Sequence, residues 1–150
     1  MRAVIQRVNA ATLAIDNQVY SEIGKGLLVL LGVGHTDTEE DIEWLAKKIV
    51  QLRIFDDPQH LMNLNIQDID GEIMIVSQFT LFASTKKGNR PSFVRAAPPQ
   101  QAIELYEKFI QKTEQLAQKT VKTGVFGANM QISLQNNGPV TIIIDTKTKE

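Results

Sequence analysis

The chain of 150 residues contains no cysteine and only two histidines. Without cysteine it can form no disulfide bridge, no thiolate zinc site and no cysteine nucleophile. The two histidines, His35 and His60, lie far apart in the sequence and belong to no HExxH pair. We therefore expect ordinary surface histidines and no metal site.

Signatures of several common enzyme classes are also missing. The sequence has no GxSxG nucleophile elbow, no P-loop, and no GxGxxG glycine pattern after a strand. A serine hydrolase, protein kinase or dehydrogenase of the usual kind is therefore not expected, and neither is a bound cofactor. An enzyme of this composition must cleave an intrinsically labile bond or take help from its substrate.

Long apolar runs and a net charge are lacking as well. The longest apolar run, GLLVLLGV at residues 26–33, is far shorter than the ~20 residues that a membrane span requires. No signal-peptide pattern follows Met1, so we expect a cytoplasmic protein without a membrane partner. Sixteen basic and 17 acidic residues give a formal charge of −1. Any RNA contact must then come from a local basic patch, and no DNA partner is expected.

Periodicity predicts an α+β fold. Helical patterns cover residues 37–52, where Asp37 and Glu40 have capping-box spacing, and a stretch that begins near Pro99. Strands are expected at residues 2–8, 12–15, 19–23, 26–33, 72–82, 119–122, 130–134 and 140–145. Two helices are too few for a doubly wound sheet. We predict one domain over residues 1–150, an antiparallel or mixed, barrel-like β-sheet with two main helices packed on it.

Three segments depart from these patterns. SQFTL (77–81) interrupts an apolar strand with polar side chains, and NNGPVT (136–141) contains a Gly-Pro pair typical of a hairpin turn. KKGNRPSF (86–93) is basic and irregular and could contact phosphates. From the residues alone, purely structural explanations are favoured: a half-exposed strand for SQFTL, a simple turn for NNGPVT and a solvated loop for KKGNRPSF.

Taken together, the segments resemble the D-aminoacyl-tRNA deacylases, which hydrolyse D-amino acids from tRNA. SQFTL and NNGPVT match the two signature motifs of that family, and KGNRPSF and FGANMQ (126–131) are similar to further family segments. The resemblance extends from MRAVIQRV at the beginning, through EIGKGLLVLLGV, to the final strand.

The resemblance implies a homodimer that acts on aminoacylated tRNA, with its active sites at the subunit interface. Gly138 and Pro139, next to Asn137, would form a cis dipeptide that enters the partner's site and receives the substrate's α-amino group. Selection would act by excluding an L side chain. Glycine has no side chain to exclude, so glycyl-tRNA should also be cleaved.

The resemblance also assigns roles to single residues. Ser77, Gln78, Phe79 and Thr80 would form the catalytic segment, with N–H groups near Phe79 and Thr80 as an oxyanion hole. Thr80 could be a nucleophile, but no base lies nearby in the sequence, which favours a positioning role. Two further sets complete the expected site: Phe126 and Met130, which line the pocket or belong to the core, and Lys86, Lys87 and Arg90, which would bind tRNA phosphates.

Two other functions remain open at this point. A noncatalytic tRNA-binding module would use the same basic loop and leave the ester intact. A general esterase would cleave small amino-acid esters as fast as tRNA esters.

Overall fold

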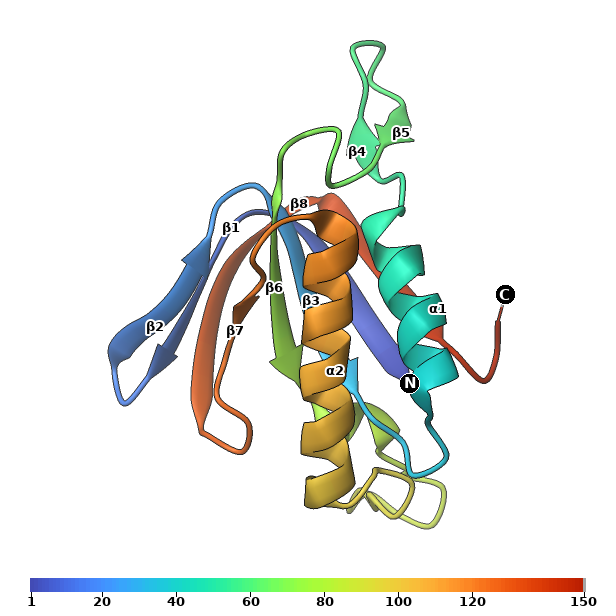
Figure 1. Cartoon of the computed structure of the whole chain (residues 1–150). Coiled ribbons are helices and arrows are strands. Elements are labelled where there is room, and N and C mark those ends of the chain that lie inside the picture. Colours follow the sequence, from blue (N-terminus) through green and yellow to red (C-terminus); the bar gives the residue numbers. More distant parts are fainter. Residues whose placement is uncertain (150) are drawn as a thin grey trace.

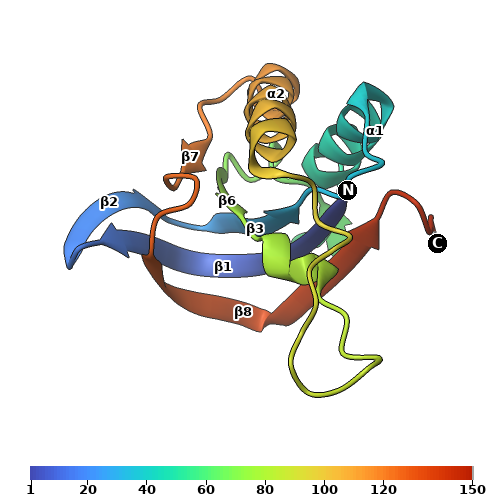
Figure 2. The ribbon, with the colours of Figure 1, turned by 90° about the horizontal axis from the view of Figure 1, so that it is seen from below.

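The computed structural model describes residues 1–149, in which a curved mixed sheet carries two helices on one face (Figure 1). Seen from below, α1 and α2 lie side by side above the sheet, while β8 curves beneath β1 (Figure 2). The elements in chain order are β1 Arg2–Ile15, β2 Gln18–Ile23, β3 Gly26–Gly32, α1 Glu39–Val50, β4 Phe55–Asp56, β5 Met62–Leu64, β6 Glu72–Ser77, the 3-10 turn η1 Phe79–Phe82, α2 Pro99–Ala117, β7 Lys122–Thr123 and β8 Met130–Asp145.

Strand β1 organises the sheet. One of its edges pairs with β8 along nearly its whole length, whereas the other pairs first with β3 and then with β2, all antiparallel. Strands β3, β6 and β7 then continue the sheet in parallel. The expected α+β fold, with two main helices on a mixed, barrel-like sheet, is confirmed.

Two apolar clusters fill the two faces of the sheet. The larger one lies beneath the helices, where the predicted apolar face of α1 packs on alternate residues of β3 and β6 such as Leu27 and Ile75. The smaller one uses the other alternate residues, including Leu28 and Met74, inside the curve formed with β1 and β8. Strand β3 is therefore buried on both faces, as its lack of alternation predicts.

The strand predicted at residues 72–82 is shorter in the structure. Strand β6 ends at Ser77, and residues 79–82 turn into η1. The apolar Leu81 and Phe82 suggested continued extension, but they are only half-buried and form part of this turn. Strand β6 therefore ends beside the polar residues of the SQFTL segment.

The predicted hairpin turn at residues 136–141 is wrong. Strand β8 runs straight through this segment, because β1 supplies a pairing partner on both sides of it: Val8 pairs with Asn136 and Gln6 with Thr141. Residues 137–140 face the single residue Arg7 and form a bulge. Gly-Pro thus interrupts the ladder without reversing the chain.

Other boundaries shift by a few residues. The strands expected at 2–8 and 12–15 are one strand, and the one expected at 119–122 begins at Lys122. The capping box of α1 uses Thr38 and Asp41, whose carboxylate accepts the Thr38 N–H at 2.8 Å, rather than Asp37 and Glu40. No helix within residues 1–149 is long and apolar enough to cross a membrane.

Candidate functional site

A cavity of about 610 Å³ opens at the carboxyl ends of the parallel strands β3 and β6. Its walls come from five segments: the end of β3, residues 76–79 at the end of β6, residues 93–97, the first turns of α2, and residues 126–132. The 93–97 segment is held against the end of β3, because Ala97 N donates to Val33 O at 2.9 Å and His35 N to Arg95 O at 3.3 Å. Binding outside the carboxyl ends of strands is a common arrangement in sheets with parallel strands.

Five of the expected site residues line this cavity: Ser77, Gln78, Phe79, Phe126 and Met130. They come from two segments about 50 positions apart in sequence. Phe126 and Met130 also contact the apolar clusters, so the pocket and core interpretations both apply to them. Thr80 does not line the cavity but follows Phe79 in η1.

The first two N–H groups of η1 are unpaired. Gln78 N donates to Leu31 O at 2.8 Å and Leu81 N to Gln78 O at 3.2 Å, which fixes the turn on β3. Within residues 1–149, the N–H groups of Phe79 and Thr80 donate no hydrogen bond. Unpaired donors are typical of the beginning of a helical turn, and two adjacent ones can stabilise a negative oxygen.

The hydroxyl of Thr80 accepts a hydrogen bond from the side-chain amide of Gln78. No histidine or carboxylate in residues 1–149 hydrogen-bonds this hydroxyl. His35, for example, has its ring Nδ1 at 3.1 Å from Arg95 O. The geometry thus provides no general base for Thr80.

Aromatic side chains form the wall and the mouth of the cavity. At the wall, Tyr106 donates its hydroxyl to Ile75 O at 2.8 Å and packs against Phe126 at a centroid distance of 6.0 Å. Burial raises the pKa of Tyr106, so this phenol remains a donor to the strand. At the mouth, Phe79 is 57% exposed and meets Phe93 edge-on, with centroids 5.0 Å apart. The sequence analysis gave neither Tyr106 nor Phe93 a pocket role.

The Gly138–Pro139 pair lies outside this cavity. Its peptide bond is cis, and both residues are exposed within the β8 bulge. The neighbouring Asn137 is held by buried Arg7, which donates to Asn137 O at 3.2 Å and to Ile54 O at 2.7 Å. Arg7 is a contact residue that sequence patterns did not single out. Its only signal was a charged residue within a strand rich in Val and Ile, a feature that Arg2 shares.

The basic loop adjoins the cavity through Phe93, which ends the KKGNRPSF segment and lines the cavity. Ser84 and Ser92 pair across its base, and Lys86, Lys87 and Arg90 between them are exposed. None of the three forms an ion pair with another described residue. Their positive charges therefore face solvent near the pocket.

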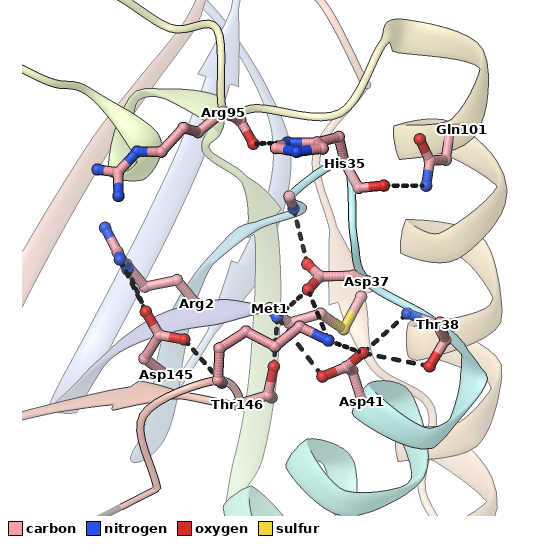
Figure 3. Close-up of polar contacts among 12 residues, drawn as sticks. Met1, Arg2, His35, Asp37, Thr38, Asp41, Arg95, Gln101, Asp145 and Thr146 are labelled. Atoms are coloured by element: carbon pink, nitrogen blue, oxygen red, sulfur yellow. Dashed lines mark hydrogen bonds and ion pairs between the residues drawn. The ribbon is translucent and has the colours of Figure 1, made fainter.

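A charged cluster lies where the two ends of the chain meet α1 (Figure 3). The α-amino group of Met1 is buried and pairs with Asp37 at 2.6 Å, while Lys147 pairs with Asp41 at 2.7 Å. Burial lowers the pKa of the amino group, and Asp37 partly offsets this. Burial alone would raise the pKa of Asp41, but hydrogen bonds from Lys147 and Thr146 outweigh it and lower that pKa. Across residues 1–149, no group of three or more His, Cys, Asp or Glu side chains could hold a metal ion.

Sequence relatives agree with the family expected from the motifs. The chain is 58% identical to a D-aminoacyl-tRNA deacylase of Parabacteroides distasonis, 57% identical to one of Cytophaga hutchinsonii, and 55% identical to one of Flavobacterium psychrophilum. Each match covers 150 residues and the whole of both chains.

Solved structures agree as well. A protein described as c-Myc DNA Unwinding Element Binding Protein is 39% identical, with a TM-score of 0.93 over 97% of this chain and 99% of its own. A probable eukaryotic D-amino acid tRNA deacylase, at 17% identity and TM-score 0.79 over 95% of this chain and 97% of its own, supports the fold alone. The family model of D-Tyr-tRNA(Tyr) deacylase matches residues 4–145. From this match and the full-length relatives, the chain belongs to the D-Tyr-tRNA(Tyr) deacylase family.

Proposed function

We propose that the chain hydrolyses the ester bond of D-aminoacyl-tRNA and releases the free D-amino acid and tRNA. The observation that carries the proposal is the pair of unpaired N–H groups at Phe79 and Thr80, which lies at the edge of a cavity of about 610 Å³. Pockets for small ligands span roughly 300–1,000 Å³. The cavity is thus large enough for an amino acid and a terminal nucleoside.

The chemistry follows from these groups. Water attacks the ester carbonyl, and the oxygen that becomes negative accepts hydrogen bonds from the N–H groups of Phe79 and Thr80. One such donor contributes roughly 10²–10³ in rate. The bond to the ribose oxygen then breaks, and that oxygen takes up the proton that the attacking water loses. Because no side-chain base bonds Thr80, we assign activation of the water to the ribose 2′-hydroxyl beside the ester, and positioning to Thr80 and Gln78.

We also propose that D-amino acids are selected by a second copy of the chain. Asn137, Gly138 and Pro139 do not line the cavity of their own subunit, yet Gly138 and Pro139 are exposed in the β8 bulge. In a homodimer, this bulge would enter the partner's cavity, where its carbonyl groups would occupy the space of an L side chain. Glycyl-tRNA would pass the same test, because glycine has no side chain to exclude.

The basic loop would bind the tRNA near the pocket. Lys86, Lys87 and Arg90 are exposed and free of acidic partners within the described part of the chain. Phosphate contacts by such residues position a nucleic acid without reading its sequence. An aminoacyl-tRNA substrate is available in the cytoplasm, so we propose that location, with residues 1–150 acting as one deacylase domain.

The test compares acyl release from D-tyrosyl-, L-tyrosyl- and glycyl-tRNA, with a chelator present throughout. The proposal expects rapid loss of the D-tyrosyl and glycyl esters and survival of the L-tyrosyl ester. Equal loss of D and L esters would leave a hydrolase but remove the exclusion mechanism. Loss of D-tyrosyl but not glycyl ester would contradict exclusion as the sole filter.

The alternative is a tRNA-binding module without catalysis, favoured only by the exposed basic loop. A folded protein that binds all three tRNAs and releases no amino acid would establish it. Cleavage of D-tyrosine ethyl ester at the rate of the tRNA ester would instead indicate a general esterase.

A further inference from the structure

Turn η1 is held at its far end by the guanidinium group of Arg2. Its Nε and Nη2 donate to Asp145 Oδ2 at 2.9 and 2.7 Å (Figure 3). Its Nη1 donates to Leu81 O at 2.6 Å. The same group lies 4.9 Å from the ring centroid of Phe82. One side chain at the start of β1 therefore joins the turn to the end of β8.

The inner side of η1 rests on two glycines of the chain at the end of β3. A Cβ atom at Gly32 would lie 3.1 Å from both Gln78 O and the Phe82 ring, and one at Gly34 would lie 3.0 Å from that ring. These distances are too short for ordinary packing, so the glycines permit the close approach. The turn is thus fixed at its beginning by Leu31 O, underneath by β3, and at its end by Arg2.

The orientation of η1 determines where its free N–H groups point. A 3-10 turn of four residues has little stability of its own, so its direction depends on such contacts. Its carbonyl end carries partial negative charge, which a guanidinium group stabilises. Oxyanion donors work at about 2.7–3.1 Å from the reacting oxygen, and a displacement of about 1 Å can lower the rate by roughly 10².

We propose that Arg2, oriented by Asp145, is a positioning residue for ester hydrolysis. It does not line the cavity. It acts by holding the carbonyl of Leu81, which keeps the N–H groups of Phe79 and Thr80 directed at the ester. This inference rests on the oxyanion role proposed above for those two groups.

The kinetic test uses Arg2→Met, which keeps the aliphatic stem and removes the guanidinium group. We expect kcat for D-tyrosyl-tRNA to fall roughly 10- to 100-fold, with KM changed by less than about twofold, because the turn shifts while the pocket walls remain. Arg53→Met is the matched control. Arg53 also donates to a backbone oxygen, Asn63 O at 2.6 Å, but lies in the exposed β4–β5 region. The Arg53→Met variant should leave kcat unchanged.

Graded variants separate positioning from general stability. Arg2→Lys keeps a cation near Leu81 O but cannot also bind Asp145 in two places, so it should recover part of the lost kcat. Asp145→Asn keeps the guanidinium group but weakens its orientation, and should lie between wild type and Arg2→Met. If Arg2→Met fails to fold, the test compares kcat of Arg2→Lys and Asp145→Asn with that of the wild-type protein.

A measurement without substrate distinguishes this inference from the proposed function. In ¹H–¹⁵N spectra, the Phe79 and Thr80 amide signals should shift in Arg2→Met and stay unchanged in Arg53→Met. Unchanged amide signals, or a wild-type kcat in folded Arg2→Met, would overturn the positioning role. If the wild-type protein released no amino acid at all, the proposed function would fail, while the amide signals would still decide whether Arg2 orients the turn.

Discussion

The Gln78 side chain determines what the hydroxyl of Thr80 can do. Because that hydroxyl already accepts a hydrogen bond from an amide, one of its lone pairs is occupied. Among residues 1–149, no histidine or carboxylate hydrogen-bonds it to remove its proton. Its free O–H can still donate to a water molecule or to the substrate. This environment suits a positioning group better than a nucleophile.

We therefore expect Thr80→Ala to lower kcat for D-tyrosyl-tRNA only about tenfold, the value of one modest hydrogen bond. Loss of a true nucleophile lowers kcat by roughly 10⁴–10⁶. Thr80→Ser, which keeps the hydroxyl, serves as the control and should stay near wild type. The rates of single-turnover acyl release are compared among the three proteins. An acyl group trapped on Thr80 of the wild-type protein would contradict the positioning role.

Single residues differ in how much the sequence reveals about them. Ser77, Phe79 and Met130 could be assigned to a site because short motifs contain them, and all three line the cavity. Arg2 and Arg7 could not, because each acts through backbone oxygens 79 and 130 positions away. Such a contact exists only after the sheet has formed.

Among the elements, the loop between Ser84 and Ser92 carries the exposed positive charge that we propose binds tRNA. If Lys86, Lys87 and Arg90 each neutralise a phosphate, log K for tRNA should fall with log salt concentration. Changing all three to Gln should reduce that slope by about one for each phosphate that is no longer neutralised. Fluorescence anisotropy of labelled tRNA at several salt concentrations measures it.

The matched control for the loop changes Lys47, Lys48 and Arg53 to Gln. It removes the same charge from the last turn of α1, which contains Lys47 and Lys48, and from Arg53 just after the helix. This control should lower affinity weakly and keep the slope. An equal reduction of the slope in both triple variants would show that binding follows net charge rather than the loop.

Two carboxylates, Asp41 in the first turn of α1 and Asp145 at the end of β8, give a prediction about stability in acid. The pKa values of Asp41 and Asp145 are lowered from an ordinary value of 3.8, so folding favours their charged forms. Their contribution to the free energy of unfolding is complete above the ordinary pKa of 3.8, and it is lost as the pH falls below about 4. Asp41→Asn should be less stable at neutral pH by about 1–3 kcal/mol and depend less on pH below 5. Urea unfolding from pH 2 to 7 measures both.

The control for acid stability is Glu40→Gln, which neutralises an exposed neighbour that forms no ion pair within the described residues. It should follow the wild-type curve. If Asp41→Asn were as stable as wild type at neutral pH, the contacts of this carboxylate with Lys147 and Thr38 would contribute no net stability.

Prediction of the elements succeeded where the pattern is local. Both helices, and the break between the strands expected at 12–15 and 19–23, follow from periodicity. Asp16 and Asn17 fill that break with positive φ angles. The β8 bulge did not, since Gly-Pro is typical of a turn unless a neighbouring strand supplies partners on both sides. The parallel pairing of β3 with β6 likewise depends on α1, which carries the chain back to the start of the sheet.

On the scale of the whole molecule, the proposed site is incomplete in one copy. The cavity and the Gly138–Pro139 bulge lie apart in the same chain, so each cavity would need a bulge from elsewhere. In a homodimer of the proposed kind, rejection of L-amino acids would depend on both subunits, whereas the free N–H groups belong to each subunit.

We expect the ratio of D- to L-tyrosyl-tRNA cleavage to fall as the protein is diluted and the dimer dissociates. Sedimentation velocity at the same concentrations gives the dimer fraction. The cleavage ratio and the dimer fraction should fall over the same range of protein concentration. The opposite result, a monomer that rejects L-tyrosyl-tRNA as strongly as the dimer, would place the chiral filter within one subunit.

The β8 bulge also bears on how such a chain tolerates insertions and deletions. Adding or removing one residue within a regular strand moves every following side chain to the opposite face. Within residues 137–140 the ladder is already interrupted, and the strand resumes its pairing with β1 at Thr141. A length change there would alter how far Gly138 and Pro139 protrude while both halves of the strand keep their faces. The reach of this segment is therefore a quantity that evolution or an engineer can adjust separately from the rest of the fold.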